Sequence, residues 1–498
     1  MFDWGTLIDP AAIASVLPGE YQRFSRPVAS ALGLFLEHLP EARQRQILAE
    51  QLAMSPSATI SQRLSVLARA CPVLHKLGQV LARDSQLAQE LRGELQQLES
   101  LPPSVQPDDI ERALSEELGP LDRLGITLTP PAIAEASVAV VIGYRQRGIH
   151  GDRLGVFKLL KPGIEQRLEE ELALASLVGE HLDEKCEEYG IPSLDYRETF
   201  EQVRDKLQAE VHLDKEQRNL ALAHEYYADD PRVHIPELYE NCTSRVTDME
   251  QLQGMKVTDF ETDNQHSRRA LANLVVEALV AKPVLSADCQ SLFHCDPHAG
   301  NLMVTDDGRL GVLDWSLVGV LTEQERVSLV QVLLAAATLS STGVVRALES
   351  IATRIDDAPA LHEVAQQWIK RVRQGELPGM RWLVGMLDEA YHLAGLRLGA
   401  DLVLFRKTLH TFDGVLNDLS GEDDRLDEVL FGQFVQQLIA EWPRRWAVMP
   451  HCRDFATRLS NFDLTRSLME IPNTATRYWL GRIRDLLSTL RTPRCPSN

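Results

Sequence analysis

An eight-residue stretch, "HCDPHAGN" (His294 to Asn301), concentrates side chains that could take part in chemistry. It follows the pattern H-x-D-x-x-x-x-N, and a further carboxylate, Asp314, comes 18 residues after Asp296. Phosphoryl transfer needs a carboxylate near the incoming nucleophile and oxygen ligands that hold Mg²⁺ against the phosphates. A loop before a hairpin can present Asp296 and Asn301 together, and a carboxylate at the end of the hairpin can contact the same ion. The types and spacing of these residues therefore favour phosphoryl transfer.

The same stretch permits a second interpretation as a metal centre. His294, Cys295 and His298, with Cys289 nearby, are residues of the types that bind zinc. Their spacing, C-x4-H-C-x2-H, fits no usual tetrahedral pattern. A metal-dependent hydrolase built on this cluster stays open as an alternative.

A lysine and a glutamate upstream strengthen the first interpretation. The run "GVFKLLKPG" places Lys158 in a β-prone segment, where a kinase-like small lobe carries the lysine that binds phosphates and pairs with a helix glutamate. The helical segment that follows offers Glu210 and Glu216. A lone strand lysine is usually a solvated charge. The shared order of lysine, glutamate, H-x-D…N and aspartate is what favours a kinase-like arrangement.

The elements that must position these residues form blocks along the chain. Apolar residues at helical spacing dominate the first part, for example in "ISQRLSVLARACPVLHKLGQVLA", and "PDDIERALSEELG" predicts a capped helix that ends at a glycine. From residue 126, the β-prone runs "ITLTP", "SVAVVIGYRQ" and "RLGVFKLL" are separated by turns, and Asp306-Asp307-Gly308 predicts a hairpin. Beyond residue 320 the pattern is mainly helical.

These blocks predict an α+β protein with a bilobal, protein kinase-like fold. We expect four parts: a helical N-terminal extension (1–125), a small β-rich lobe (126–250), a larger helical lobe (251–425) and a helical, Arg-rich tail (426–498).

Composition restricts the class of protein and its surroundings. A net charge of -21 over 498 residues argues against a nucleic-acid partner. The seven scattered cysteines include no C-x-x-C pair, which favours a reducing cytosol over a disulfide framework. Neither a signal peptide nor an apolar run long enough to span a membrane is found in the sequence. We therefore expect a cytoplasmic protein, with peripheral contact at the inner face of a membrane as an option.

The chain resembles the UbiB/AarF (ABC1/ADCK) family of atypical protein kinase-like proteins. The likeness runs from about residue 60 to 425. It rests on "HKLGQVLA", which holds the K-x-G-Q motif, on the alanine-rich "AEASVA", on "FKLLKPGI", on "AEVHLDKEQRNLA", on "FHCDPHAGNLMVTDDGRLGVLDW" and on "LRLGADLVLFRKTLHTFDGVLNDL". Ordinary kinases lack both K-x-G-Q and H-x-D-P-H-x-G-N.

The resemblance implies a role for each matching residue. Lys158 would contact the nucleotide phosphates with Glu216 as its helix partner, Asn301 and Asp314 would hold Mg²⁺, and Asp296 would take the catalytic-loop position. Further nucleotide contacts are implied for Ala134, Ala136, Ser137 and Glu250. A regulatory extension that limits protein kinase activity is implied for Lys76, Gly78, Gln79 and Glu210. The expected cofactors are ATP and Mg²⁺. The expected activity is an ATPase or a small-molecule or lipid kinase that supports isoprenoid-quinone (ubiquinone) biosynthesis or lipid homeostasis.

Four departures from the family pattern make a catalytically impaired pseudokinase scaffold the main alternative. His212 replaces the aspartate of the helix motif E-x-D, Glu135 and Val140 alter the alanine-rich loop, and Ala299 replaces a proline. The motif D-F-G reads Asp314-Trp315-Ser316. Because glycine allows backbone angles that serine resists, we expect a less mobile loop after Asp314.

The C-terminal tail has the opposite charge to the rest of the chain. From Trp442 to Asn498 it holds ten arginines, no lysine and four acidic residues. The segment "TRYWLGRIRDLLSTLR" predicts an apolar, Arg-rich helix that could lie in a membrane interface, although docking on the acidic body of the protein is the favoured interpretation. The sequence leaves the phosphoryl acceptor (lipid, small molecule, protein or water) and the oligomeric state open.

Overall fold

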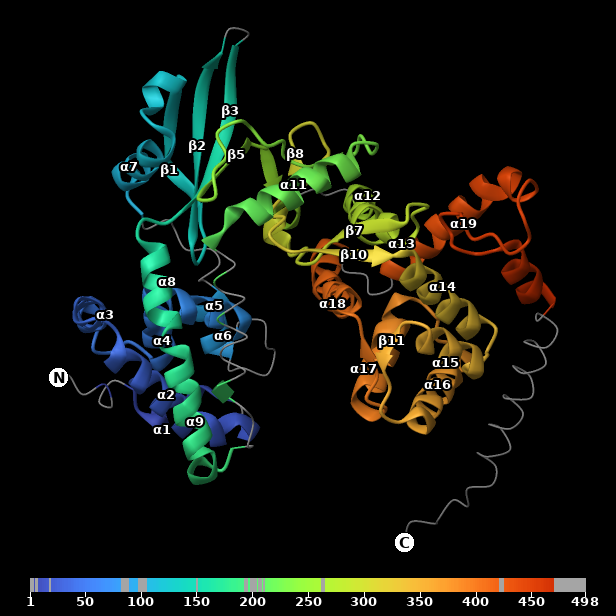
Figure 1. Cartoon of the computed structure of the whole chain (residues 1–498), viewed down its shortest axis with the longest axis horizontal. Helices are drawn as coiled ribbons and strands as arrows, with labels where there is room; N and C mark the ends of the chain where they lie inside the picture. The colour runs from blue at the N-terminus through green and yellow to red at the C-terminus, as the bar shows by residue number, and fades with distance from the viewer. Residues whose placement is uncertain are drawn as a thin grey trace. The chain divides into compact units, whose positions relative to one another are not determined.

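The computed structural model describes residues 4, 8–17, 19–81, 89–96, 105–148, 151–191, 196–197, 204, 208, 211–260, 265–420 and 425–469. The chain divides into two compact units (Figure 1). Unit 1 comprises Met1–Arg218 and Glu237–Gln251, and unit 2 comprises Asn219–Pro236 and Leu252–Asn498. Both units combine helices with sheets, so the prediction of an α+β protein is confirmed. The four-part division of the chain stays a prediction.

The helices of unit 1 lie before strand β1 (Ile126–Glu135) and after strand β3 (Gly151–Leu160) in the chain. They are α1 (Pro10–Val16), α2 (Ser25–His38), α3 (Glu41–Ala53), α4 (Ile60–Ala70), α5 (Pro72–Leu81), α6 (Gln89–Gln96), α7 (Pro107–Leu118), α8 (Ile164–Leu172) and α9 (Ala175–Tyr189). Local sequence explains several boundaries. Thr59 and Gln62 form a capping box at the start of α4. As predicted, α7 ends at Gly119, whose φ of 83° suits glycine.

A four-stranded antiparallel sheet follows the first helices of unit 1 in the order β1-β2-β3-β5. Its strands are β1 (Ile126–Glu135), β2 (Ala139–Gly148), β3 (Gly151–Leu160) and β5 (Val246–Glu250). One face packs on α7 through an apolar core that includes Ile110, Leu114, Ile142, Tyr144, Phe157 and Leu159. A second core joins the early helices to α9, and includes Leu36, Ile47, Leu67 and Leu182. The β-prone runs read from the sequence therefore form one sheet.

Helix α11 (Leu213–Tyr227) crosses from unit 1 to unit 2 after Arg218. The β elements of unit 2 are β4 (Val233–His234), β6 (Gly254–Lys256), β7 (Gln290–His294), β8 (Leu302–Thr305), β9 (Leu310–Val312), β10 (Val318–Thr322), β11 (Ala352–Arg354) and β12 (Arg397–Leu398). They pair as β4-β9-β8-β6, β10-β7 and β11-β12. The β8–β9 hairpin turns at Asp306-Asp307-Gly308, as the sequence predicted.

The rest of unit 2 is mainly helical. Its helices are α12 (Gln265–Val276), α13 (Lys282–Val284), α14 (Glu323–Ala337), α15 (Ser341–Glu349), α16 (Ala358–Arg373), α17 (Met380–Leu393), α18 (Ala400–Ser420) and α19 (Arg425–Arg445). A capping box of Thr322 and Glu325 starts α14 directly after β10. Within the described ranges, no helix combines the length and the apolar character needed to cross a bilayer. The predicted Arg-rich helix near residues 476–491 lies outside the described residues.

Candidate functional site

An ion pair in unit 1 joins strand β3 to helix α11. Lys158 Nζ lies 2.6 Å from Glu216 Oε1 and 2.8 Å from Glu216 Oε2. The two side chains are only 13% and 9% exposed, so water screens the pair weakly. Lys158 sits between Val141 of β2 and Thr247 of β5, so the sheet fixes its backbone. A strand lysine paired with a helix glutamate is the arrangement expected in the small lobe of a kinase-like fold.

The alanine-rich loop closes the turn between β1 and β2. Ala136 N donates to Ala139 O at 2.8 Å, Ser137 is buried, and Ala134 and Ala136 are exposed. Glu135, which departs from the family pattern, forms a 2.7 Å ion pair with Lys161. Burial lowers the pKa of Lys161 below its ordinary value, although Glu135 opposes this shift. The departure therefore has a structural partner that holds the loop against the end of β3.

Glu250 ends strand β5 opposite Gly155. Its Oε2 accepts a hydrogen bond from the backbone N of Glu237 at 3.3 Å, and its own N donates to Glu237 O at 2.8 Å. Glu250 is thus the last residue of β5, and the chain passes from unit 1 to unit 2 after Gln251.

The K-x-G-Q motif lies on α5. Lys76 is half-buried and Gly78 is buried, whereas the side chain of Gln79 and the whole of Glu210 lie outside the described residues. The start of α5 is held by a carboxylate from α8, because Val73 N donates to Glu171 Oε2 at 2.9 Å. The other oxygen of Glu171 accepts from Arg43 at 2.6 Å. A buried network therefore positions the helix that carries the motif.

In unit 2, His294 organises the loop that contains Asp296. Strand β7 pairs with β10, and His294 lies opposite Val318. Asp296 N donates to His294 Nδ1 at 3.1 Å, so Nδ1 must be unprotonated. Nε2 then carries the proton and donates to the carbonyls of Leu313 and Asp314 at 3.1 and 3.0 Å. A single neutral imidazole thus ties the Asp296 loop to the segment that ends at Asp314.

This geometry predicts a pH dependence of stability. Burial lowers the pKa of His294 below its ordinary value, so the folded protein keeps the ring neutral while the unfolded chain protonates it near pH 6.5. Stability from this residue is therefore fully present above about pH 6.5 and is lost as pH falls towards the lower folded pKa. Unfolding midpoints measured from pH 5 to 8 with a chelator should decline on the acid side, and His294→Gln should flatten that decline. Equal slopes in the two proteins would exclude His294 as the responsible group.

Asn301 and Asp314 lie at the same end of the β8–β9 hairpin. Leu302 pairs with Val312, and Leu313 N donates to Asn301 O at 2.8 Å. The amide nitrogen of Asn301 donates to Asp296 O at 3.1 Å, which leaves the amide oxygen as the group for another ligand. Asp314 is exposed. An amide oxygen and a carboxylate are hard donors of the type that Mg²⁺ prefers, so these residues fit that ion.

The segment after Asp314 is anchored rather than strained at Ser316. Asp314 itself has a φ of 50°, a region that Asp and Asn tolerate well, whereas Ser316 is not among the described residues with positive φ. Trp315 is buried, its Nε1 donates to Val312 O, and its carbonyl accepts from Asn219 Nδ2 at 3.0 Å. The contacts of the buried Trp315 therefore anchor this segment, and the lower mobility expected after Asp314 stays a prediction.

The alternative metal centre at His294, Cys295 and His298 is not formed. Across the described residues, no group of three His, Cys, Asp or Glu side chains is placed to hold a metal ion. Both nitrogens of His294 are engaged, and burial raises the pKa of Cys295 to about 12, which disfavours the thiolate that zinc needs. His298 Nδ1 accepts from Gly300 N at 3.1 Å, and a Cβ on Gly300 would approach the same ring. His298 and Gly300 therefore shape the loop.

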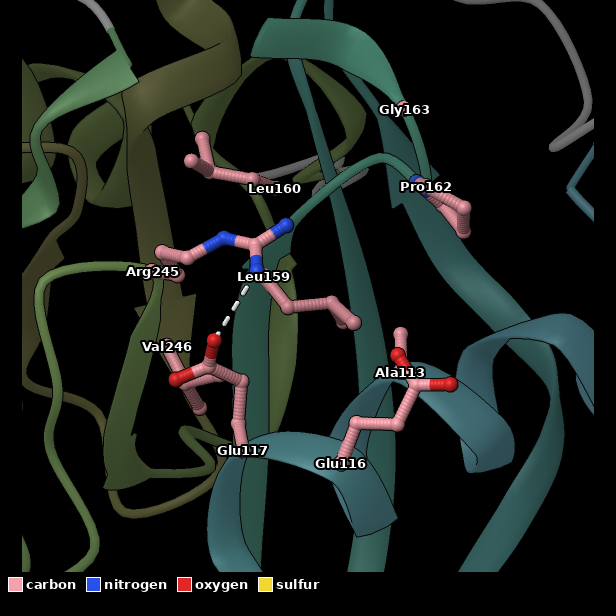
Figure 2. A pocket seen from close by; sticks show the side chains of 9 residues that line it. All are labelled: Ala113, Glu116, Glu117, Leu159, Leu160, Pro162, Gly163, Arg245 and Val246. Atoms are coloured by element: carbon pink, nitrogen blue, oxygen red, sulfur yellow. Dashed lines mark hydrogen bonds and ion pairs between the residues drawn. The ribbon is translucent and has the colours of Figure 1, made fainter.

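Unit 1 holds a cavity of about 110 Å³, and neither Lys158 nor Glu216 is among its lining residues. Figure 2 shows the side chains that line it. The cavity lies between α7 and the end of β3. Its lining residues are Ala113, Glu116, Glu117, Leu159, Leu160, Pro162, Gly163, Arg245 and Val246. Arg245 contacts both Glu117 and Glu165 at 3.0 Å. Because these carboxylates already neutralise Arg245, the cavity suits a phosphate poorly.

Two polar side chains of unit 2 that the sequence reading did not single out also support the site. Asn219 Nδ2 donates a hydrogen bond to Trp315 O, and Thr408 Oγ1 donates to Cys295 O at 3.0 Å. Asn219 follows Glu216 by three residues on the same helix, a spacing that could have drawn attention to it. Thr408 is 113 residues from Cys295, and no local pattern marks it.

Comparison with known proteins agrees with this geometry. A family model of the ABC1 atypical kinase-like domain matches residues 97–348, just over half of the chain. The chain therefore belongs to the ABC1 atypical kinase-like family, and the resemblance found in the sequence is confirmed.

Individual relatives each match about half of the chain. An uncharacterised, chloroplastic aarF domain-containing protein kinase of Arabidopsis thaliana is 34% identical over 250 residues, which are 49% of this chain and 45% of the relative. A probable protein kinase UbiB of Pseudomonas paraeruginosa is 27% identical over 278 residues, or 53% and 50% of the two chains. The matches span about half the length of these relatives. Among solved structures, the erythromycin complex of Mycobacterium tuberculosis Rv3197 has a TM-score of 0.48 at 19% identity, over 76% of this chain and 92% of that chain.

Proposed function

We propose that this chain is an atypical kinase or ATPase that binds ATP with Mg²⁺ and transfers the γ-phosphoryl group to a hydroxyl acceptor or to water. The acceptor oxygen would form a bond to the γ-phosphorus, and the bond from that phosphorus to the β,γ-bridging oxygen would break, releasing ADP. The proton of the acceptor would go to the Asp296 carboxylate. The observation that carries this proposal is the ion pair of Lys158 and Glu216, at 2.6 Å and largely shielded from water.

Each residue has a distinct task in this proposal. Lys158 binds phosphate oxygens, and Glu216 holds the lysine in position while β2 and β5 fix its strand. Asp296 orients the acceptor from a loop that His294 and Asn301 support. Asn301 and Asp314 would hold Mg²⁺, which would supply the positive charge that neutralises the phosphates during transfer.

Replacement of Lys158 with Met tests the phosphate-binding role. The change keeps most of the side-chain length and removes the charge, so the affinity for a fluorescent ATP analogue should fall at least about tenfold, the loss expected for a charged contact worth roughly 1.4 kcal/mol or more. Glu216→Gln should weaken binding by a smaller factor because the lysine remains. Lys185→Met, which removes an exposed lysine from α9, is the matched control. Equal affinities in wild type and Lys158→Met would refute the assignment.

The acceptor is proposed from the family. We propose a lipid-like or small-molecule hydroxyl compound in isoprenoid-quinone (ubiquinone) metabolism or lipid homeostasis. This follows from membership of the family that includes UbiB relatives. Assays of phosphate transfer to prenylated phenols, with water as the competing acceptor, would test this proposal. Release of inorganic phosphate without transfer to the phenol would indicate an ATPase instead.

A pseudokinase scaffold is the second candidate. The buried Trp315 and the hydrogen bond from Asn219 to its carbonyl favour it, because they anchor the segment where the family resemblance leads us to expect D-F-G. A scaffold would bind nucleotide without releasing phosphate. Single-turnover measurement of γ-phosphate release by the full chain separates the two: release above the uncatalysed rate supports the enzyme, and its absence with intact binding supports the scaffold.

A further inference from the structure

Gln217, the residue after Glu216 on α11, connects that helix to strand β5. Its Nε2 donates to Thr243 O at 2.8 Å, to Val246 O at 3.0 Å and to Thr247 Oγ1 at 3.0 Å. A carboxamide has two N–H groups, so the three acceptors share two hydrogens. The side chain of Gln217 is half-buried, and Thr247 is fully buried. These contacts therefore tether α11 to the start of β5 and to the turn before it.

The register of the sheet places this tether directly beside the ion pair. Lys158 of β3 lies opposite Thr247 of β5. Residues directly opposite each other in an antiparallel pair have their side chains on the same face of the sheet, with Cβ atoms about 5 Å apart. Two consecutive residues of α11 thus contact two opposite residues of the sheet, because Glu216 pairs with Lys158 and Gln217 donates to Thr247. The tether and the ion pair therefore share one face of the sheet.

The rotation of α11 about its axis decides where Glu216 points. Successive side chains of an α-helix are turned by about 100°, so a rotation of part of that angle would move the carboxylate away from Lys158. Leu213 lies one turn before Gln217 on the same side of the helix, and its N donates to Ser244 O at 3.0 Å. Bonds to the same strand segment from two positions one turn apart fix both the place and the rotation of this end of α11.

We propose that Gln217 is a positioning residue, which sets the rotation of α11 so that the carboxylate of Glu216 meets Lys158. This inference deepens the proposed function, and only its effect on nucleotide affinity rests on that function. Gln217 acts through Glu216 and needs no contact of its own with the nucleotide. A purely structural role, in which the amide only stabilises the turn before β5, would leave the ion pair independent of Gln217.

Site-resolved labelling of lysine tests the positioning without nucleotide. The full chain would be treated briefly with an acylating reagent, and modification of Lys158 would be quantified by mass spectrometry. Gln217→Met keeps the side-chain size and removes the donor, so labelling of Lys158 should become about threefold faster, towards the rate in Glu216→Gln, because a carboxylate that moves away shields the amine less. Gln166→Met, the same change at an exposed amide of α8, should leave the rate unchanged. Equal rates in wild type and Gln217→Met would overturn the proposal.

A double-mutant cycle separates positioning from a general structural role. In the wild-type background, Gln217→Met should weaken binding of a fluorescent ATP analogue by about threefold, a factor within the range of one net hydrogen bond. In the Glu216→Gln background the same change should have no further effect, because the carboxylate that Gln217 positions is already absent. An equal loss in both backgrounds would refute the proposal, since Gln217 would then act independently of Glu216.

Thr247→Val is a milder variant that keeps the test decisive if Gln217→Met does not fold. It removes one of the three acceptors at nearly constant volume, so labelling of Lys158 should rise by a smaller factor, and an unchanged rate would contradict the proposal. Hydrogen exchange of peptides from α11 verifies that each variant is folded. Absence of nucleotide binding by the wild type would refute the proposed function alone, because the labelling rates would still decide whether Gln217 positions Glu216.

Discussion

Replacement of Asp314 with Asn should abolish the Mg²⁺-dependent part of ATP binding and any release of phosphate. A neutral amide is a much poorer ligand for a hard divalent cation than a carboxylate. Asparagine is also a mild substitution here, because it tolerates the φ of 50° at this position and can still accept the hydrogen bond from Ser316 N. The thermal stabilisation by ATP with Mg²⁺, about 2.7 kcal/mol at a hundredfold excess over Kd, should fall to the value without Mg²⁺.

The matched control is Asp306→Asn, which makes the same change of charge in the turn of the same hairpin, where the side chain is exposed. It should leave binding and turnover intact. Full Mg²⁺ dependence in Asp314→Asn would show that this carboxylate does not hold the ion, whereas equal loss in both variants would indicate a general effect of charge.

Removal of either partner from the Arg43–Glu171 pair should destabilise unit 1 by about 3–5 kcal/mol, since the other buried charge would lose its main partner. Arg43 is 8% exposed and Glu171 is 1% exposed. Burial raises the pKa of Glu171 against the hydrogen bonds from Arg43 and Val73. Burial alone would lower the pKa of Arg43, but Glu171 holds it above its ordinary value. Hydrogen exchange of peptides from α5 and α8 should report the loss, because stability differs between parts of a protein.

A double-mutant cycle gives this prediction its sharpest form. Arg43→Met and Glu171→Met should each be strongly destabilising, and the double variant should recover most of the loss because two apolar side chains can pack where two charges were. Arg45→Met removes an exposed ion pair from the same helix, between side chains 75% and 78% exposed, and should cost at most about 1 kcal/mol. If the double variant is as unstable as the sum of the single variants, the pair does not act as a unit.

The sequence predicted those parts of the fold that local patterns determine. Turn residues located the β8–β9 hairpin, and Gly119 marked the end of α7. The order of motifs also predicted a lysine and glutamate pair, which the structure forms with Lys158 and Glu216. Short-range spacing suffices for the hairpin and for the end of the helix. The pair of Lys158 and Glu216, 58 residues apart, was predicted from the order of the motifs instead.

Other features depend on packing between distant segments. Arg43 and Glu171 are 128 residues apart, and neither belongs to a motif. The hydrogen bond from Asn219 to Trp315 could not be predicted from the sequence. Comparison of the motif D-W-S with D-F-G pointed to the replacement of glycine by Ser316, not to the tryptophan. The zinc interpretation failed because hydrogen bonds with loop backbone groups, which the sequence does not reveal, engage both ring nitrogens of His294.

The central claim is that the chain binds ATP through Mg²⁺, and a thermal-shift titration of the full chain tests it most directly. ATP and ADP would each be titrated with and without Mg²⁺, since a ligand that binds only the folded state must raise its stability. We predict a dose-dependent rise with ATP that is much larger in the presence of Mg²⁺. Identical unfolding curves at every nucleotide concentration, with and without Mg²⁺, would contradict the account.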